Sequence, residues 1–302
     1  MALIGTSVLA GFLAVTPLLA GRSAIVTDYS TGAVLWAEDA EAKRYPASLT
    51  KLMTLYLLFE SVENGRVTLD QKLPVTKNAA QQPPTRLRLR PGSTIRVAEC
   101  IDALILRSAN DVAVVVAEAL GGSESAFAAS MTRKAAELGM TDTVFRNASG
   151  LPDDGQITTA RDLSILARAL MKRFPEFYSH FSVRASRAAG KGIVTHNSFL
   201  AAYDGADGLK TGYTQAAGHN LAASATRGGH RLVGIVLGEP SCSSRDRKMA
   251  QVMNESFLSL GVPPNRPASK RAGKPGRRRR PRGHAAHAAR SARQPVRPGA
   301  ID

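Results

Sequence analysis

Short apolar runs occur near both ends of the central part of the chain, separated by turn-forming residues. Residues 24–27 and 33–36 flank a Tyr-Ser-Thr-Gly turn, and residues 220–226 and 231–237 flank Arg-Gly-Gly-His. Short β-prone runs on either side of a glycine-containing turn are typical of hairpins. The pattern therefore predicts one β-hairpin toward each end of this part of the chain.

Helical periodicity fills the sequence between these hairpins. The residues after Ser48 are apolar almost all round, which predicts a core helix. Residues 61–100 are polar and rich in turns, with prolines as breakers. Further helices are predicted by apolar spacing, and Gly139 is a typical C-terminal cap for one of them. These helices cover residues 98–106, 111–120, 124–138, 160–173 and 244–260.

Strands at both ends with helices between them predict an α/β (α+β) fold. The expected arrangement is one antiparallel sheet flanked by helices, plus an all-helical subdomain inserted after the first helix. With 302 residues and 44% hydrophobic content, the chain has ample apolar material for such a core.

The start of the first core helix carries a candidate nucleophile and a candidate base. Pro46 precedes Ser48, and Lys51 follows three residues later. Residues at i and i+3 share one face of a helix, so the lysine amine can reach the serine hydroxyl. A serine is a weak nucleophile until a base takes its proton, and an amine of lowered pKa can be that base. A buried helix otherwise has little reason to hold a lysine.

Two further motifs follow along the chain. Ser108 and Asn110 form a Ser-x-Asn motif between apolar segments, and Lys210, Thr211 and Gly212 follow a glycine-rich turn. Ser-x-x-Lys, Ser-x-Asn and Lys-Thr-Gly, in this order, are the motif set of penicillin-recognising serine enzymes. Each triplet can occur by accident, but all three in these contexts predict such an active site.

The chain from residue 23 to about residue 262 resembles the low-molecular-mass penicillin-binding proteins, which are D-alanyl-D-alanine carboxypeptidases. Besides the three motifs, the resemblance rests on residues 23–28, 89–93, 137–140, 149–153, 158–163 and 207–214. It implies a β-lactamase/DD-peptidase-like fold, with the active site between a sheet subdomain and a helical subdomain. It also implies an enzyme that removes the terminal D-Ala from peptidoglycan stem pentapeptides and is acylated by β-lactams such as penicillin.

The resemblance implies a set of catalytic residues. Ser48 is expected to be acylated, and its place at a helix N-terminus favours developing negative charge. Lys51 is the expected base, with a pKa lowered by burial and by the ammonium group of Lys210. Ser108 is expected to bridge the two lysines and pass a proton to the leaving amine. The backbone N–H groups of Ser48 and Tyr213 are expected to form the oxyanion hole.

Other residues are expected to bind the substrate. Asn110 offers an amide to the substrate backbone, and Lys210 and Thr211 meet its terminal carboxylate from a strand edge. Gly212 leaves room for that strand to approach the ligand. Arg245 matches an arginine that helps to hold the carboxylate in some relatives, and a surface arginine at a helix start is the alternative interpretation.

The remaining reactive residues do not form a recognisable site. The six histidines show no metal-ligand spacing, so no metal or other cofactor is expected. His219 and His230 are expected to be structural or exposed. Cys100 and Cys242 are too few for a disulfide framework, and whether they pair stays open. Cys242 is expected to be a loop residue.

Three alternative functions share some of these features. A class A β-lactamase would carry Glu-x-x-Leu-Asn after the Ser-x-Asn motif, and no such run occurs, so deacylation of penicillin should be slow. A DD-endopeptidase of the same fold stays open, although the local matches favour the carboxypeptidase. A non-catalytic wall-binding protein is the third alternative, and the intact Ser48, Lys51, Ser108 and Lys210 argue against it.

The first residues predict export. Residues 1–21 carry no charge and are rich in Leu, Ala and Val, as in the apolar region of a secretory signal with cleavage near Ala20. The segment lacks a positive n-region, and its length approaches that of a spanning helix. Pro17 favours cleavage over anchoring. The expected location is the periplasm or another extracytoplasmic part of the cell envelope, with residues 22–262 as the catalytic domain.

The last forty residues carry most of the net charge. Residues 263–302 hold twelve Lys and Arg and one acidic residue, which contributes +11 to the formal net charge of +16. They have almost no large apolar side chains, which predicts a disordered basic tail. An anionic membrane or wall surface fits the rest of the chain better as its partner than nucleic acid does.

Overall fold

The computed structural model of the chain describes residues 21–263. The predicted signal segment, except Gly21, and the predicted basic tail, except Pro263, lie outside the described residues. Within the described part, no single helix has the length and hydropathy to cross a membrane. Only the bent pair α4 (Asn110–Gly121) and α5 (Glu124–Leu138), with an angle of 82° between them, meets that test jointly.

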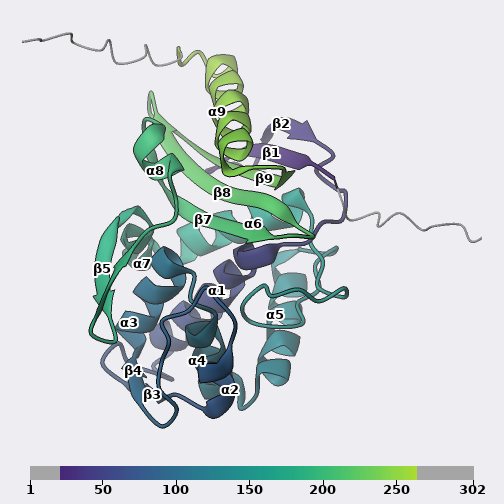
Figure 1. Cartoon of the computed structure of the whole chain (residues 1–302). Coiled ribbons are helices and arrows are strands. Elements are labelled where there is room, and N and C mark those ends of the chain that lie inside the picture. The colour runs from purple at the N-terminus through teal and green to yellow at the C-terminus, as the bar shows by residue number, and fades with distance from the viewer. Residues whose placement is uncertain (1–20, 264–302) are drawn as a thin grey trace, which may run out of the picture. The chain divides into compact units, whose positions relative to one another are not determined.

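The strands form a five-stranded antiparallel sheet in the order β2-β1-β9-β8-β7 (Figure 1). Both predicted hairpins are present, and β7 joins the second of them at the edge of the sheet. The strands are β1 (Ser23–Asp28), β2 (Val34–Glu38), β7 (Ala206–Thr214), β8 (Gly218–Arg227) and β9 (His230–Glu239). The antiparallel sheet predicted from the sequence is therefore confirmed.

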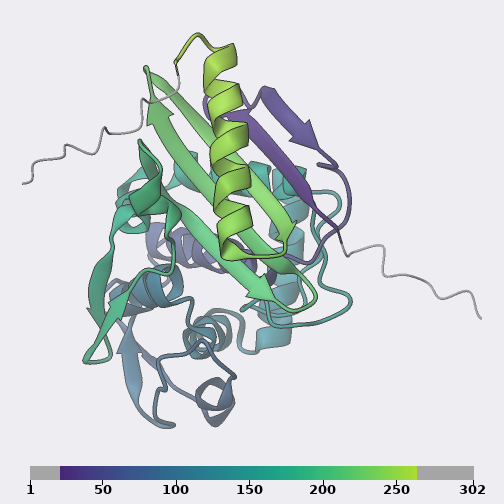
Figure 2. The same cartoon turned by 45° about the horizontal axis from the view of Figure 1, so that its top comes forward.

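Helices cover both faces of this sheet. The helix α9 (Cys242–Ser259) lies across one face, and α6 (Ala160–Arg173) packs on the other (Figures 1 and 2). Because successive strand residues point to opposite faces, Ala24 and Val26 of β1 pack in the cluster beneath α9, whereas Ile25 packs in the larger helical core. The strands β1, β8 and β9 are thus mostly buried on both sides, whereas the edge strand β2 is partly or fully exposed.

The predicted helices are present with small changes in their bounds. Besides α4, α5, α6 and α9, they are α1 (Lys51–Glu63) and α3 (Val97–Asp102). The predicted helix at residues 98–106 differs most, because α3 passes into a wider π-helical turn at Ala103–Arg107 that ends at Ser108. Ser108 has a left-handed backbone with φ 57°, which stops the helix and turns the chain toward α4.

Short elements complete the described chain and were not predicted individually. They are β3 (Lys72–Pro74), α2 (Lys77–Gln81), β4 (Thr94–Arg96), α7 (Pro175–Tyr178), a 3-10 turn at Ser179–Ser182, β5 (Ala185–Ala188), β6 (Lys191–Val194) and α8 (Phe199–Ala202). Elements of three to five residues are too short to show a period in the sequence.

Candidate active site

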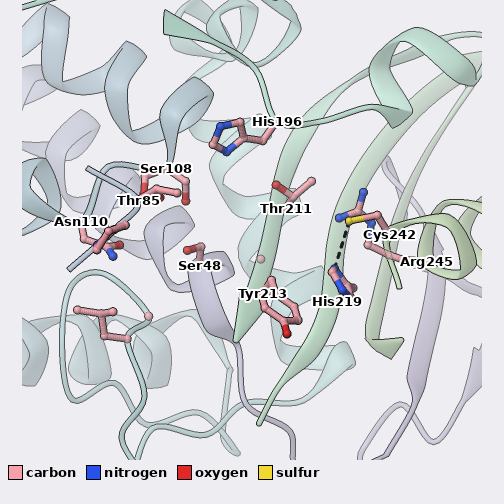
Figure 3. A pocket seen from close by; sticks show the side chains of 14 residues that line it. Ser48, Thr85, Ser108, Asn110, His196, Thr211, Tyr213, His219, Cys242 and Arg245 are labelled. Carbon is pink, nitrogen blue, oxygen red and sulfur yellow. Dashed lines mark hydrogen bonds between the residues drawn. The ribbon is translucent and has the colours of Figure 1, made fainter. Parts of the chain in front are cut away.

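Ser48 lies in a tight turn at the base of α1. The turn is the 3-10 helix η1 (Ala47–Thr50), which leads directly into α1, so Ser48 precedes the α-helix rather than beginning it. Ala47, immediately before it, has a positive φ of 47°, a sparsely populated backbone conformation that occurs at functional sites. This turn places the Ser48 hydroxyl in a pocket, in front of the N-terminus of α1 (Figure 3).

Lys51 connects the nucleophile candidate to two other parts of the chain. Its side chain is fully buried, and its Nζ donates to Ser48 Oγ at 3.2 Å. The same amine donates to Asn110 Oδ1 at 2.8 Å and to the carbonyl oxygen of Ser149 at 2.5 Å. The predicted Ser48–Lys51 contact is therefore present, and α4 and the loop after Asn147 hold the amine in place.

The electrostatic surroundings lower the pKa of both buried lysines. Burial, followed by the positive charge of Lys210, lowers the pKa of Lys51 well below its ordinary value, while Asp111 and Glu124 oppose that change. Burial and then Arg245 lower the pKa of Lys210 to about 7. A buried amine that is readily neutral can accept a proton, so Lys51 is suited to be a base.

Ser108 forms half of the bridge that the sequence predicts. Its Oγ accepts a hydrogen bond from Lys210 Nζ at 2.9 Å, but no hydrogen bond joins it to Lys51 within the part of the chain described here. Asn110 contacts Lys51 instead. The Asn110 Nδ2 donates to the carbonyl of Pro83 at 3.0 Å, so this side chain contacts both Lys51 and Pro83 in addition to facing the pocket.

The strand β7 brings Lys210, Thr211 and Gly212 to the serine turn. Lys210 is 2% exposed and lies beside Ser108. A Cβ atom at Gly212 would lie 3.0 Å from the backbone N of Ser48, so the glycine allows the edge strand to pack against the turn itself. The close approach that was expected toward a ligand is therefore seen toward the protein backbone.

An ion-pair cluster anchors the start of β7. Asp207 accepts hydrogen bonds from Arg231 Nη1 at 2.6 Å and from the Tyr178 hydroxyl at 2.7 Å. Burial, and then the Asp207 charge, raises the pKa of Tyr178, which keeps it a hydrogen-bond donor. Since Lys210 follows three residues later, this cluster helps to set its position.

Ser48 and the residues of the other two motifs surround a cavity of about 400 Å³ that opens beside β7 (Figure 3). All the predicted site residues except the two buried lysines contribute to its wall. They are Ser48, Ser108, Asn110, Thr211, Gly212, Tyr213 and Arg245. The sequence prediction therefore selected residues that lie together in space, from η1, α4, β7 and α9 and the turn before α4.

Arg245 belongs to the pocket rather than to the surface. It is 3% exposed, lines the cavity, and donates from Nε and Nη2 to Asp246 Oδ1 at 2.9 and 2.7 Å. The alternative of an exposed surface arginine is therefore wrong. Its buried positive charge lies near Lys210, where an anionic group of a ligand would be stabilised.

Cys242 and His219 are also part of the pocket wall, which the sequence did not predict. Cys242 is the first residue of α9 rather than a loop residue, and its Sγ lies 3.3 Å from His219 Nδ1 (Figure 3). The His219 ring stacks on Tyr213 with centroids 4.3 Å apart. Both Cys100 and Cys242 are free thiols, and only Cys242 is exposed.

The sequence profile of the D-alanyl-D-alanine carboxypeptidase family, peptidase family S11, matches residues 12–241. The chain belongs to this family. The family predicted from the motifs is therefore confirmed, and the fold agrees with it.

Several members of the carboxypeptidase family are similar over most of this chain. D-alanyl-D-alanine carboxypeptidase DacF of Bacillus subtilis is 32% identical, over 80% of this chain and 64% of its own length. DacA of Escherichia coli is 33% identical, over 80% and 62% respectively. The chain thus spans less than two thirds of these curated relatives.

Solved structures of penicillin-binding proteins share the fold. Penicillin-binding protein 5 from Haemophilus influenzae has a TM-score of 0.75 at 29% identity, covering 80% of this chain and 71% of that one. Penicillin-binding protein D2 from Listeria monocytogenes, in its ampicillin-bound form, has a TM-score of 0.69 at 32% identity, covering 80% and 98%. The predicted DD-peptidase-like fold class is therefore confirmed.

Further pocket residues of this family member had weak or no signals in the sequence. Gly150 and Leu151 lie in the 149–153 segment, which carries part of the family resemblance, and both line the pocket. Gly150 has φ +84°, and a Cβ there would lie 1.9 Å from the carbonyl oxygen of Ala47, so this glycine lets the loop contact the serine turn. Thr85 and His196 also line the pocket but have no signal in the sequence, because neither lies in a motif.

His196 faces the pocket as a neutral side chain held by an arginine. Its Nε2 lies 3.2 Å from Arg107 Nη1, and an arginine can only donate, so Nε2 accepts. Burial, then the charges of Lys210 and Arg107, lower the pKa of His196. The imidazole therefore presents its other nitrogen as a donor.

Proposed function

We propose that this chain is a serine D-alanyl-D-alanine carboxypeptidase that removes the terminal D-Ala from peptidoglycan stem pentapeptides through an acyl-enzyme on Ser48. One observation carries the proposal. The Ser48 hydroxyl lies in a pocket that also holds Thr211 and Arg245, and the Nζ of Lys51, a fully buried lysine of lowered pKa, lies 3.2 Å from that hydroxyl. This arrangement can both activate a nucleophile and attract a carboxylate.

The acylation step follows from this geometry. Neutral Lys51 takes the proton of the Ser48 hydroxyl as the oxygen attacks the carbonyl carbon before the terminal D-Ala. The backbone N–H groups of Ser48 and Tyr213 stabilise the negative charge on the carbonyl oxygen. The C–N bond then breaks, and the proton that Lys51 received passes by way of Ser108 to the departing amine. Lys51 is neutral again, and an ester on Ser48 remains.

Substrate recognition uses charges on the other side of the pocket. The terminal carboxylate would lie against Thr211 with Lys210 and Arg245 behind it, because all three offer donors or positive charge there. Lys51 then takes a proton from a water molecule as its oxygen attacks the ester carbonyl, and gives that proton to the Ser48 oxygen as the ester bond breaks. A β-lactam carries a similar carboxylate and an acylating amide, so it should acylate Ser48 and be released slowly.

The purified protein should release free D-Ala from a soluble peptide ending in D-Ala-D-Ala. The rate should be unchanged by a metal chelator, because no step uses a metal ion. An enzymatic assay for free D-alanine, with a peptide ending in L-Ala-L-Ala as the matched control, measures it. If cross-linked muropeptides were cleaved while terminal D-Ala was left in place, the DD-endopeptidase would replace this proposal; if neither were cleaved and penicillin did not bind, the non-catalytic wall-binding alternative would hold.

We also propose that the protein is exported, with residues 1–21 as a signal segment, residues 22–262 as the catalytic domain and residues 263–302 as a basic tail. The apolar start of the sequence and its peptidoglycan-directed family support an extracytoplasmic location. The charge of the tail supports attraction to anionic membrane or wall surfaces.

A chain ending at Val262 should keep its turnover of small peptides, because every proposed site residue precedes the cut. It should lose salt-sensitive sedimentation with anionic vesicles or cell-wall sacculi. Attraction of the full chain should fade as salt approaches 1 M, where the Debye length is roughly 3 Å. Uncharged vesicles are the control. Unchanged sedimentation of the shortened chain would contradict the tail's role.

A further inference from the structure

The peptide segment that holds Lys51 is itself held from two helices. The carbonyl of Ser149 accepts the Lys51 hydrogen bond. One residue earlier, the carbonyl of Ala148 accepts from Thr54 Oγ1 of α1 at 2.7 Å. The N–H of Ala148 donates to Glu124 Oε1 of α5 at 3.1 Å. This peptide is therefore fixed between α1 and α5, and Glu124 supplies the contact from α5.

Glu124 lies outside the pocket wall, beside the peptide that holds Lys51. It is the first residue of α5, after the N-cap Ser123, and it is partly buried. Burial raises the pKa of its carboxyl, the Ala148 N–H and the charge of Lys51 lower it, and Glu118 raises it. Partial burial of the Glu124 carboxylate costs desolvation free energy, and its hydrogen bond to Ala148 and its attraction to Lys51 offset that cost.

We propose that Glu124 is a positioning residue for Lys51, which fixes the 148–149 peptide through the Ala148 N–H and places a negative charge behind the amine. The inference rests on the proposed function of Lys51 as the base. Glu124 does not line the pocket, so it acts on the reaction only through other groups.

The hydrogen bond of Glu124 to Ala148 and the negative charge of Glu124 affect Lys51 in separable ways: the first affects its position and the second its pKa. Lys51 experiences one group that disfavours its charged form, Lys210, and two that favour it, Asp111 and Glu124. Removing the charge of Glu124 should therefore lower the pKa of Lys51 further. Removing the hydrogen bond should instead free the 148–149 peptide from α5, while Thr54 still holds it to α1, and let the amine shift relative to Ser48.

Two variants of Glu124 separate these contributions. Glu124→Gln removes the charge but keeps a carbonyl oxygen for the Ala148 N–H. Its acylation rate at the plateau should stay within about twofold of wild type, while the acidic limb of the pH profile moves to lower pH. Glu124→Ala leaves the N–H unpaired, and its plateau rate should fall about tenfold or more, because small displacements of a catalytic group are costly.

The measurement is the rate of acylation by a fluorescent penicillin across pH, for the full chain and each variant. Glu118→Gln is the matched control: it makes the same chemical change on α4, where Glu118 accepts from Thr76 and Asn78, and it should not move the limb. Thermal unfolding checks that each variant is folded.

The outcomes distinguish this inference from the proposed function. If wild-type protein is not acylated, the proposed function fails. If wild type is acylated and Glu124→Gln leaves the limb in place, or Glu118→Gln moves it equally, the inference is overturned. If Glu124→Ala does not fold, the isosteric Gln variant alone decides through the position of its limb.

Discussion

Replacing Ser48 by alanine should abolish both penicillin labelling and release of D-Ala, with little change in the free energy of unfolding. The serine oxygen is the only atom proposed to bond to the substrate, and loss of a nucleophile of this kind costs on the order of 10⁶-fold in kcat. The fold should tolerate the change, because the Lys51 amine keeps its hydrogen bonds to Asn110 and Ser149.

Intact-mass analysis after penicillin treatment, followed by peptide mapping, measures this effect. Wild-type protein should gain one adduct, located on the peptide that contains Ser48. Ser93→Ala is a suitable control, since the hydroxyl of that serine donates to the carbonyl of Arg90 and the residue lies outside the pocket. An adduct on a different peptide, or labelling that survives Ser48→Ala, would contradict the assignment of the nucleophile.

Replacing Lys51 by arginine should eliminate acylation, whereas the same change at Lys210 should leave part of it. Both lysines are buried and both changes add the same bulk, so they form a matched pair. An arginine does not deprotonate and cannot be a base, but it keeps the positive charge that a carboxylate requires. Loss of general-base catalysis typically costs about 10²–10⁴-fold, so acylation of Lys51→Arg should fall below detection.

The pH profile of kcat/KM tests the same assignment from another direction. The rate should rise with pH as Lys51 loses its proton, and this limb should lie well below the ordinary lysine range, because burial and Lys210 lower the pKa of Lys51. At higher pH, kcat/KM should fall as Lys210, whose pKa is about 7 in the free protein, loses its charge. In Lys210→Arg the falling limb should disappear. Comparable acylation by Lys51→Arg and wild type would refute the base assignment.

Much of the fold was predictable because its elements have strong local signals. The helices at residues 124–138 and 160–173 have their predicted bounds, since Ser123 and Thr159 cap their starts through side-chain hydrogen bonds and Gly139 ends the first of them. The hairpin of β8 and β9 was visible from its Gly-Gly turn. The short hairpin of β5 and β6 was not, because four-residue strands have too little pattern to be read.

The candidate site was predictable where residue type alone indicates chemistry. Ser48, Lys51, Ser108 and Lys210 form motifs, and the structure places them within hydrogen-bond reach in pairs. Contacts made through the backbone could not be predicted. The carbonyl of Ser149 has no sequence signature, because every residue has one and only the fold selects which of them meets Lys51.

The order of strands has a consequence for how the site assembles. The strand β9 occupies the middle of the sheet, between β1 at residues 23–28 and β8, and β7 reaches β1 only through these two. The strands β1 and β9 pair although about two hundred residues separate them in the sequence, and such non-local pairings are typical of slow-folding topologies. The sheet is therefore complete only after residues 230–239 have been synthesised, because the first strand of the described chain pairs with the last one, although β7 itself packs directly on the turn of Ser48.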